Sequence, residues 1–111
     1  MFEQRLSYRV PLDIYLNKFI RGVPYMSRSR DISRDGIFLN QLLEPVNEGE
    51  RIGVQFQLPG TNEVIYAEGH IVRERQKAGR VGHGIRFTLI TDYHRRLIDR
   101  FIRRSANAAA A

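Results

Sequence analysis

The chain has 111 residues, a formal net charge of +6 and a sequence pI of about 10.3. Its hydrophobic fraction of 42% is ordinary for a globular protein, so the length predicts one domain with one core. Cysteine is absent, which excludes disulfides, thiolate metal sites and cysteine nucleophiles. The charged N-terminus and the lack of a long apolar run predict a cytoplasmic protein without a signal peptide or a membrane span.

Positive charge lies at the two ends of the sequence, in residues 1–34 and 92–111, and only Lys18 and Lys77 are lysine. Arginine forms bidentate hydrogen bonds with phosphates and with the O6/N7 edge of guanine, so an anionic partner is compatible with this composition. A GC-rich coding sequence would favour arginine equally well. The bias alone therefore selects no partner.

The first residues are polar and lack helical periodicity, and we interpret residues 1–9 as a flexible N-terminal arm. Alternating apolar residues then predict a half-buried strand over residues 10–16, with Pro11 at its edge or start. Residues 21–24 predict a turn that leads into the polar stretch 31–36.

Beyond this stretch, the pattern predicts strands at residues 37–39, 52–58, 64–75 and 81–89. Residues 59–62, Pro-Gly-Thr-Asn, predict a hairpin connection, and Gly69 predicts a bulge or bend within its strand. Short strands at this spacing are typical of an antiparallel barrel or sandwich.

The period changes at the C-terminus, where Leu97, Ile98, Phe101 and Ile102 form an apolar stripe. This stripe predicts an amphipathic helix over residues 92–104, with Thr91 or Asp92 as its N-cap, lying over an open end or face of the sheet. Residues 105–111 are expected to form a disordered tail.

No set of residues in this sequence predicts catalysis. His70, His83 and His94 lack the spacing of metal ligands, and Ser33 has no local base to activate it. We therefore expect no enzymatic activity, no metal and no cofactor.

The stretch 31–36, Asp-Ile-Ser-Arg-Asp-Gly, is typical of a polar turn whose side chains bond to their own backbone. If the segment is extended, Asp31 and Ser33 point to the same face. Gly36 either adopts positive φ or lets the backbone come close to another group.

Taken together, Arg5 and Arg9 in the arm and the pattern Asp31-x-Ser33-x-x-Gly36 resemble the PilZ domain family. Residues 84–87, Gly-Ile-Arg-Phe, match the family's G-x-x-F strand, and residues 92–104 match its closing helix. The resemblance spans about residues 3–104.

The resemblance implies a six-stranded antiparallel β-barrel capped by one amphipathic helix, over residues 10–104, that binds cyclic di-GMP. Arg5 and Arg9 are expected to bind phosphate and guanine O6/N7, and Asp31 to accept hydrogen bonds from the guanine N1–H and N2–H₂ groups. Ser33 would add a hydrogen bond, and Gly36 would allow close approach of the ligand. Further contacts are expected from Arg30, Arg34, His83 and Gly84.

The implied mechanism is an adaptor whose arm, residues 1–9, becomes ordered on the ligand and whose altered surface is read by an effector protein. We expect a monomer or weak dimer. The sequence departs from the family where Gln4 replaces a common basic residue, which favours one bound ligand over a stacked pair. Two alternatives remain open: a small basic barrel that binds RNA or DNA, and a protein-interaction domain of the same fold that binds no nucleotide.

Overall fold

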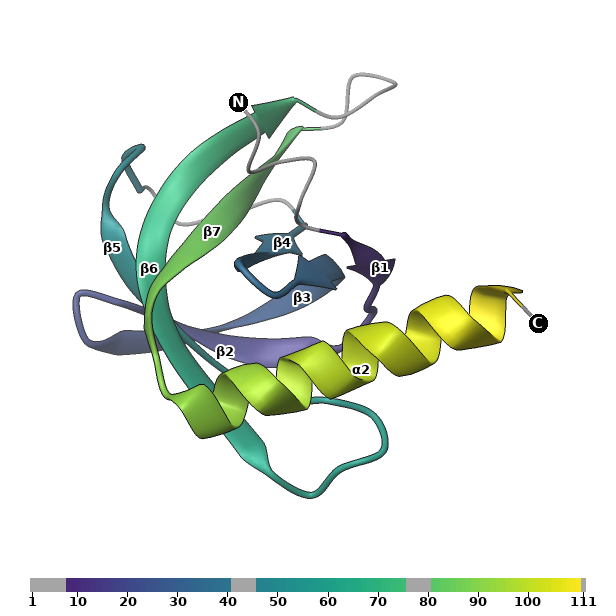
Figure 1. Cartoon of the computed structure of the whole chain (residues 1–111). Coiled ribbons are helices and arrows are strands. Elements are labelled where there is room, and N and C mark those ends of the chain that lie inside the picture. The colour runs from purple at the N-terminus through teal and green to yellow at the C-terminus, as the bar shows by residue number, and fades with distance from the viewer. Residues whose placement is uncertain (1–7, 41–45, 76–80, 111) are drawn as a thin grey trace.

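The computed structural model describes residues 8–40, 46–75 and 81–110. Within these ranges the chain forms seven strands and one helix, namely β1 (Val10–Pro11), β2 (Tyr15–Ile20), β3 (Val23–Ser33), β4 (Gly36–Leu39), β5 (Arg51–Gln57), β6 (Val64–Arg75), β7 (Val81–Ile90) and α2 (Asp92–Ala110). Figure 1 shows the strands curving around a common interior, with α2 lying across one end of the barrel.

The sheet closes on itself. Neighbouring strands are antiparallel in the order β3–β2–β5–β6–β7–β4, and β4 pairs with β3 again, which closes six strands into a barrel. β1 is an additional short strand that pairs with β3 at Ile32 and Asp31, on the edge that β2 occupies further along. The predicted six-stranded antiparallel barrel with a C-terminal helix is therefore confirmed, with one extra strand.

The strand predicted over residues 10–16 is interrupted. β1 ends at Pro11 and β2 begins at Tyr15, and between them the Leu12 N–H donates to the Arg30 carbonyl and the Ser29 N–H to the Ile14 carbonyl, both at 2.9 Å. In the gap, the Ser29 hydroxyl donates to the Leu12 carbonyl at 2.5 Å and accepts from the Ile14 N–H at 3.1 Å. The prediction of one continuous strand is wrong because a side chain, the Ser29 hydroxyl, replaces part of the regular backbone ladder at Leu12 and Ile14.

Side chains at every second strand position fill the barrel, as the alternation predicted. The core is made of almost fully buried apolar residues: Val10, Leu12, Leu16, Ile20, Ile32, Ile37, Leu39, Ile52, Val54, Phe56, Leu58, Ile65, Ala67, Ile71, Ile85, Phe87, Leu97 and Ile98. Lys18 takes the inward position between Leu16 and Ile20, pairs with Val54, and is only 2% exposed. The sequence did not predict this burial, because lysine is a charged residue that is usually exposed.

The longest ladder joins β6 and β7, and it contains the irregularity predicted at Gly69. The register shifts between Glu68 and Gly69, which is a bulge. A Cβ on Gly69 would lie 1.9 Å from the Arg86 carbonyl oxygen, so only glycine lets the two backbones come this close. The predicted hairpin connection after β5 is also present, with Gly60 at φ +88°.

Thr91 is the N-cap of α2, since its hydroxyl accepts a hydrogen bond from the His94 N–H at 3.1 Å. The helix continues to Ala110, past the boundary predicted at residue 104, so residues 105–110 are helical and not a tail. Alanine is the strongest helix former, which accounts for the extension. In the part of the chain that is described, no helix has the length and apolar character needed to cross a membrane.

Candidate functional site

Residues 31–36 form the end of one strand, a two-residue turn and the start of the next strand. Asp31 and Ser33 end β3, and Gly36, which pairs with Ser33, begins β4. The Ser33 hydroxyl accepts a hydrogen bond from the Asp35 N–H at 3.2 Å and lies 3.5 Å from the Gly36 carbonyl oxygen. The predicted bonding of a polar side chain to the local backbone is thus confirmed for Ser33.

The register places Asp31, Ser33 and Gly36 on the outer face of the barrel. Paired residues in an antiparallel sheet share a face, and neighbouring residues of one strand point to opposite faces. Ile32 and Ile37 are paired and buried in the core. The residues on either side of them therefore point outward, as expected for Asp31 and Ser33.

Only one of the two candidate residues on β7 lies on this outer face. Gly84 pairs with Phe38 and lies on the same face as Asp31, whereas His83 pairs with the fully buried Leu39. The structure therefore does not bring His83 together with the other candidates. The sequence could not separate the two, because the face of each depends on the register between β4 and β7.

Gly36 is required by a close approach between strands. Its φ is not in the left-handed region, which among the described glycines is occupied by Gly22, Gly49 and Gly60. A Cβ on Gly36 would lie 2.5 Å from the Ile85 carbonyl oxygen on β7. Of the two interpretations of Gly36, close approach is correct, and the approaching group is the neighbouring strand.

Phe38 is part of this face and was not singled out by sequence reasoning. It is 2% exposed, yet it does not belong to the barrel core, and the Arg30 guanidinium lies 6.0 Å from its ring centroid. Arg30 is the extra residue of a bulge, since the register of β3 with β4 shifts between Ser29 and Asp31. The bulge and the cation–π contact together hold the Arg30 guanidinium near Phe38, the residue that pairs with Asp31.

The turn between β3 and β4 is attached to α2. Arg34 Nε lies 3.5 Å from Asp99 Oδ1, and Arg95 Nη1 lies 3.7 Å from Asp35 Oδ1. Arg95 Nη1 also donates to the Arg34 carbonyl at 3.0 Å, and the Asp35 carbonyl accepts from the Phe87 N–H at 2.8 Å. The Arg34 side chain is thus engaged with the helix, which the sequence alone did not indicate.

Arg9 is exposed and directly precedes β1. Because Val10 pairs with Ile32, the backbone of Arg9 lies beside the end of β3 that carries Ser33. Arg5 lies outside the described residues, so its place relative to Asp31 stays a prediction.

The outer face of β3, β4 and β7 therefore offers a half-exposed carboxylate, Asp31, and an exposed guanidinium, Arg9, at the same end of the barrel. A carboxylate accepts hydrogen bonds, and a guanidinium donates two in parallel to phosphate or to a ring edge. Such a pair suits a ligand that combines N–H donors with anionic groups. Among the described residues, no cluster of His, Asp and Glu is arranged to hold a metal.

The fold and this face define a small closed antiparallel barrel with a C-terminal helix and a polar hairpin on its outer surface. The chain belongs to the PilZ domain family, whose model matches residues 3–104. No curated protein sequence gives a match.

Solved structures share the fold. The inhibitor of motility MotI/DgrA of Bacillus subtilis has a TM-score of 0.71 and 17% identity, over 91% of this chain and 51% of that chain, so this chain spans about half its length. The PilZ domain of CeSA from a cellulose synthesizing bacterium has a TM-score of 0.61 and 19% identity, over 86% and 95% of the two chains. The PilZ domain of YcgR from Escherichia coli, solved with c-di-GMP, has a TM-score of 0.61 and 15% identity, over 93% and 92%.

Proposed function

We propose that the protein is a receptor for cyclic di-GMP. The observation that carries this proposal is the placement of half-exposed Asp31 on the same outer face as Gly36 and Gly84, with exposed Arg9 beside the same strand. Membership of the PilZ domain family supports it, as does the similarity to the YcgR domain that was solved with c-di-GMP.

Asp31 selects guanine in this proposal. Its carboxylate accepts hydrogen bonds from the N1–H and N2–H₂ groups of a guanine that lies against β3. Adenine has no such pair of donors on that edge, so it would leave a carboxylate oxygen unpaired. Ser33 would contribute its O–H, because its bond to the Gly36 carbonyl is long at 3.5 Å and is easily exchanged for a ligand acceptor.

The arginines supply charge. Arg9 and Arg5 donate to the phosphates and to guanine O6/N7, where bidentate contacts are favoured. Arg30 lies next to Asp31 over Phe38, so it is a further contact. Arg34 would have to leave Asp99 to reach the ligand, and it is the weaker candidate for that reason.

The response to the ligand is proposed to be ordering of residues 1–9 over the outer face, which creates a surface that an effector protein reads. No reaction is part of this role, and we infer that the protein is a binding adaptor and not an enzyme.

Calorimetric titration of the full chain with cyclic di-GMP, GTP and a short RNA tests the proposal. Saturable binding is expected for cyclic di-GMP alone. Arg9→Ala and Asp31→Ala should each lower the affinity at least about tenfold, because each removes a charge-assisted hydrogen bond of about 1.5–3 kcal/mol. Arg51→Ala is the control, since Arg51 is an exposed arginine on β5 and should leave the affinity unchanged.

No heat with cyclic di-GMP at tens of micromolar protein would contradict the proposal. Binding of the RNA, steeply weakened by salt, would favour a nucleic-acid-binding barrel instead. If Arg9→Ala and Asp31→Ala bound like the parent protein, the residue assignment would be wrong even if the ligand were right.

A further inference from the structure

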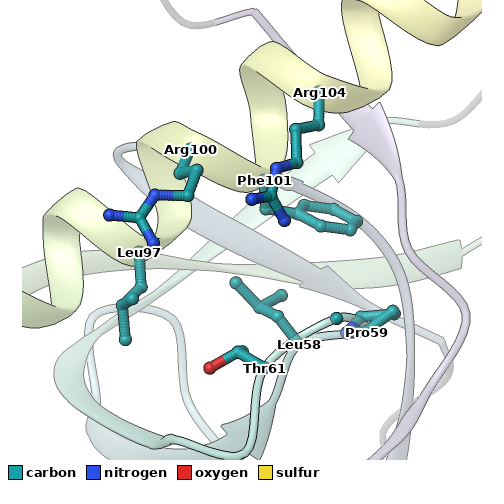
Figure 2. Close-up of a pocket in the computed structure, with 8 residues that line it drawn as sticks. Leu58, Pro59, Thr61, Leu97, Arg100, Phe101 and Arg104 are labelled. Carbon is teal, nitrogen blue, oxygen red and sulfur yellow. The ribbon is translucent and has the colours of Figure 1, made fainter.

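A concave surface lies between α2 and the connection from β5 to β6, and its lining includes none of the candidate nucleotide-binding residues. It is a cavity of about 90 Å³ whose floor is formed by Leu58, Leu97 and Phe101 and whose rim carries Arg100 and Arg104. Figure 2 shows the Arg104 guanidinium extending from α2 toward the loop beside Phe101, and the Arg100 guanidinium extending along the helix over Leu97. We call this surface the helix groove.

The floor of the helix groove is continuous with the barrel core. Leu58 is 2% exposed and Leu97 is 8% exposed, and both belong to the core cluster, while Phe101 packs against it. An apolar cavity of about 150 Å³ holds a benzene molecule, so a cavity of about 90 Å³ suits an aliphatic side chain better than an aromatic ring. The groove thus accepts one small apolar group.

The rim of the helix groove is positive, and the described residues that line the groove include no acidic side chain. Arg100 and Arg104 are four residues apart, which puts two like charges side by side on one face of the helix. Both are exposed, and within the described part of the chain neither guanidinium forms an ion pair or a hydrogen bond. The nearest acidic residue along the helix, Asp99, pairs with Arg34.

The loop beneath the arginines lies close to one of them. Gly60 has φ +88°, and a Cβ built on it would lie 3.7 Å from Arg104 Nη1, so this loop presents bare backbone to the guanidinium. Two unpaired guanidinium groups above an apolar floor are complementary to carboxylates that flank an aliphatic side chain.

We propose that the helix groove binds an acidic segment of a partner protein. One aliphatic side chain of that segment fills the cavity over Leu58, and adjacent Asp or Glu carboxylates pair with Arg100 and Arg104. This surface gives the adaptor role proposed above a place for its partner, but it does not need cyclic di-GMP in order to bind. The two proposals can therefore fail separately.

Selection of random displayed peptides on the purified full chain tests this proposal. Enriched peptides should carry at least two acidic residues beside Leu, Ile or Val, and a synthetic peptide of the enriched sequence is then titrated by fluorescence anisotropy. Replacing its aliphatic residue by Ala, or its acidic residues by Asn or Gln, should each weaken binding at least about tenfold. Binding should also weaken as salt is raised.

The protein variants use two pairs of arginines from the same helix. Arg100→Gln with Arg104→Gln should lower the peptide affinity at least about tenfold. Arg96→Gln with Arg103→Gln removes the same charge from exposed residues of α2 that do not line the groove, and should change the affinity less than about threefold.

Equal losses in the two double variants would overturn the proposal, since binding would then depend only on net charge. So would a selection that enriches no peptide, or enriches peptides without acidic residues. Calorimetry of the Arg100→Gln, Arg104→Gln variant with cyclic di-GMP keeps the two sites distinct, because its nucleotide affinity should equal that of the parent protein.

Discussion

Glycine is required at position 36 by the closeness of a neighbouring strand and not by a backbone conformation that only glycine adopts. A side chain there would press against the Ile85 carbonyl oxygen, which β7 cannot move without disturbing its pairing with β6. The same reasoning applies to Gly69 on β6, where the Arg86 carbonyl oxygen is closer still. Both glycines therefore keep strands of one barrel close to each other.

Gly36→Ala should lower the free energy of unfolding by about 1–3 kcal/mol, as overpacking in well-packed interiors usually does. Urea denaturation measures this change. Gly22→Ala is a useful comparison, because Gly22 has no atom within 4 Å of an added Cβ but has φ +81°. It should cost about 1–2 kcal/mol through its backbone conformation alone. A Gly36→Ala protein as stable as the parent would show that β4 and β7 separate easily.

Asp13 offers a test of pH dependence at a single residue. Arg28 donates to its two carboxylate oxygens at 2.5 Å and 2.8 Å, and these hydrogen bonds hold the pKa of Asp13 below its ordinary value of 3.8. Because the folded pKa is the lower one, the pair stabilises the fold above pH 3.8, and this contribution is lost as the pH falls through the folded pKa.

The stability difference between the parent and Asp13→Asn should therefore be present at neutral pH and disappear in acid. Denaturant titrations at a series of pH values measure it, and because both side chains are exposed the difference should be small. A stability difference between the two proteins that grows below pH 3.8 would contradict a lowered pKa for Asp13 in the folded state.

At the scale of elements, the interruption between β1 and β2 depends on one buried hydroxyl. Ser29 is 1% exposed, and its hydroxyl bonds to both Leu12 and Ile14 in the segment between the two strands. The Ser29 hydroxyl thus takes the place of a backbone partner for the Ile14 N–H and the Leu12 carbonyl. The arm that carries Arg9 therefore enters the barrel at a position set by a side chain of β3.

Ser29→Ala should lower the free energy of unfolding by about 1–3 kcal/mol, because it leaves a buried N–H and a carbonyl without their partner. Thermal unfolding followed by circular dichroism measures the loss. Ser27→Ala, at a half-buried serine of the same strand, should have a much smaller effect. Equal effects of the two substitutions would mean that the Ser29 hydrogen bonds are easily replaced by water.

The attachment of the β3–β4 turn to α2 joins the candidate nucleotide site to the helix. Its ion pairs are partly exposed, so they contribute little to stability. They do fix the turn that follows Asp31 and Ser33. A looser turn would have to be ordered when the ligand binds, and that cost would appear in the affinity.

Asp99→Asn should therefore weaken cyclic di-GMP binding a few-fold while changing the unfolding free energy by less than about 1 kcal/mol. Calorimetry and urea denaturation on the same preparation separate the two effects. Asp13→Asn is the matched control, since it removes an exposed ion pair that does not touch the turn. An equal loss of affinity in both variants would show that the ion pair between the turn and α2 does not specifically support ligand binding.

At the scale of the whole molecule, the fold was predictable because strands of a closed barrel bury alternate residues. Period-2 alternation and strong turn signals located β4 to β7 and the bulge at Gly69. They gave no strand over Val23–Ser33, where β3 begins inside the turn predicted at residues 21–24, because the polar residues of this segment hide the alternation. The break after Pro11 and the burial of Lys18 were missed, since both depend on groups contributed by distant strands. The end of α2 was placed too early because the alanine-rich end carries no apolar stripe.

The candidate site was predictable in its residue types and order, but not in its geometry. Asp31, Ser33 and Gly36 follow a recognisable pattern. The face occupied by Phe38, the separation of Gly84 from His83, and the engagement of Arg34 by α2 all depend on pairing between segments far apart in the sequence. Local periodicity carries no information about such register.

The position of β4 between β3 and β7 also bears on how fast the site forms and decays. The hairpin of β3 and β4 is local and forms in about 1–10 μs, but β4 must then pair residues 36–39 with residues 83–86 of β7. Such long-range strand pairing is slow, so the outer face is completed only when the barrel closes. A ligand that needs this face binds after the folding barrier has been crossed. Cyclic di-GMP should accordingly prolong the lifetime of the folded barrel and leave its folding rate unchanged.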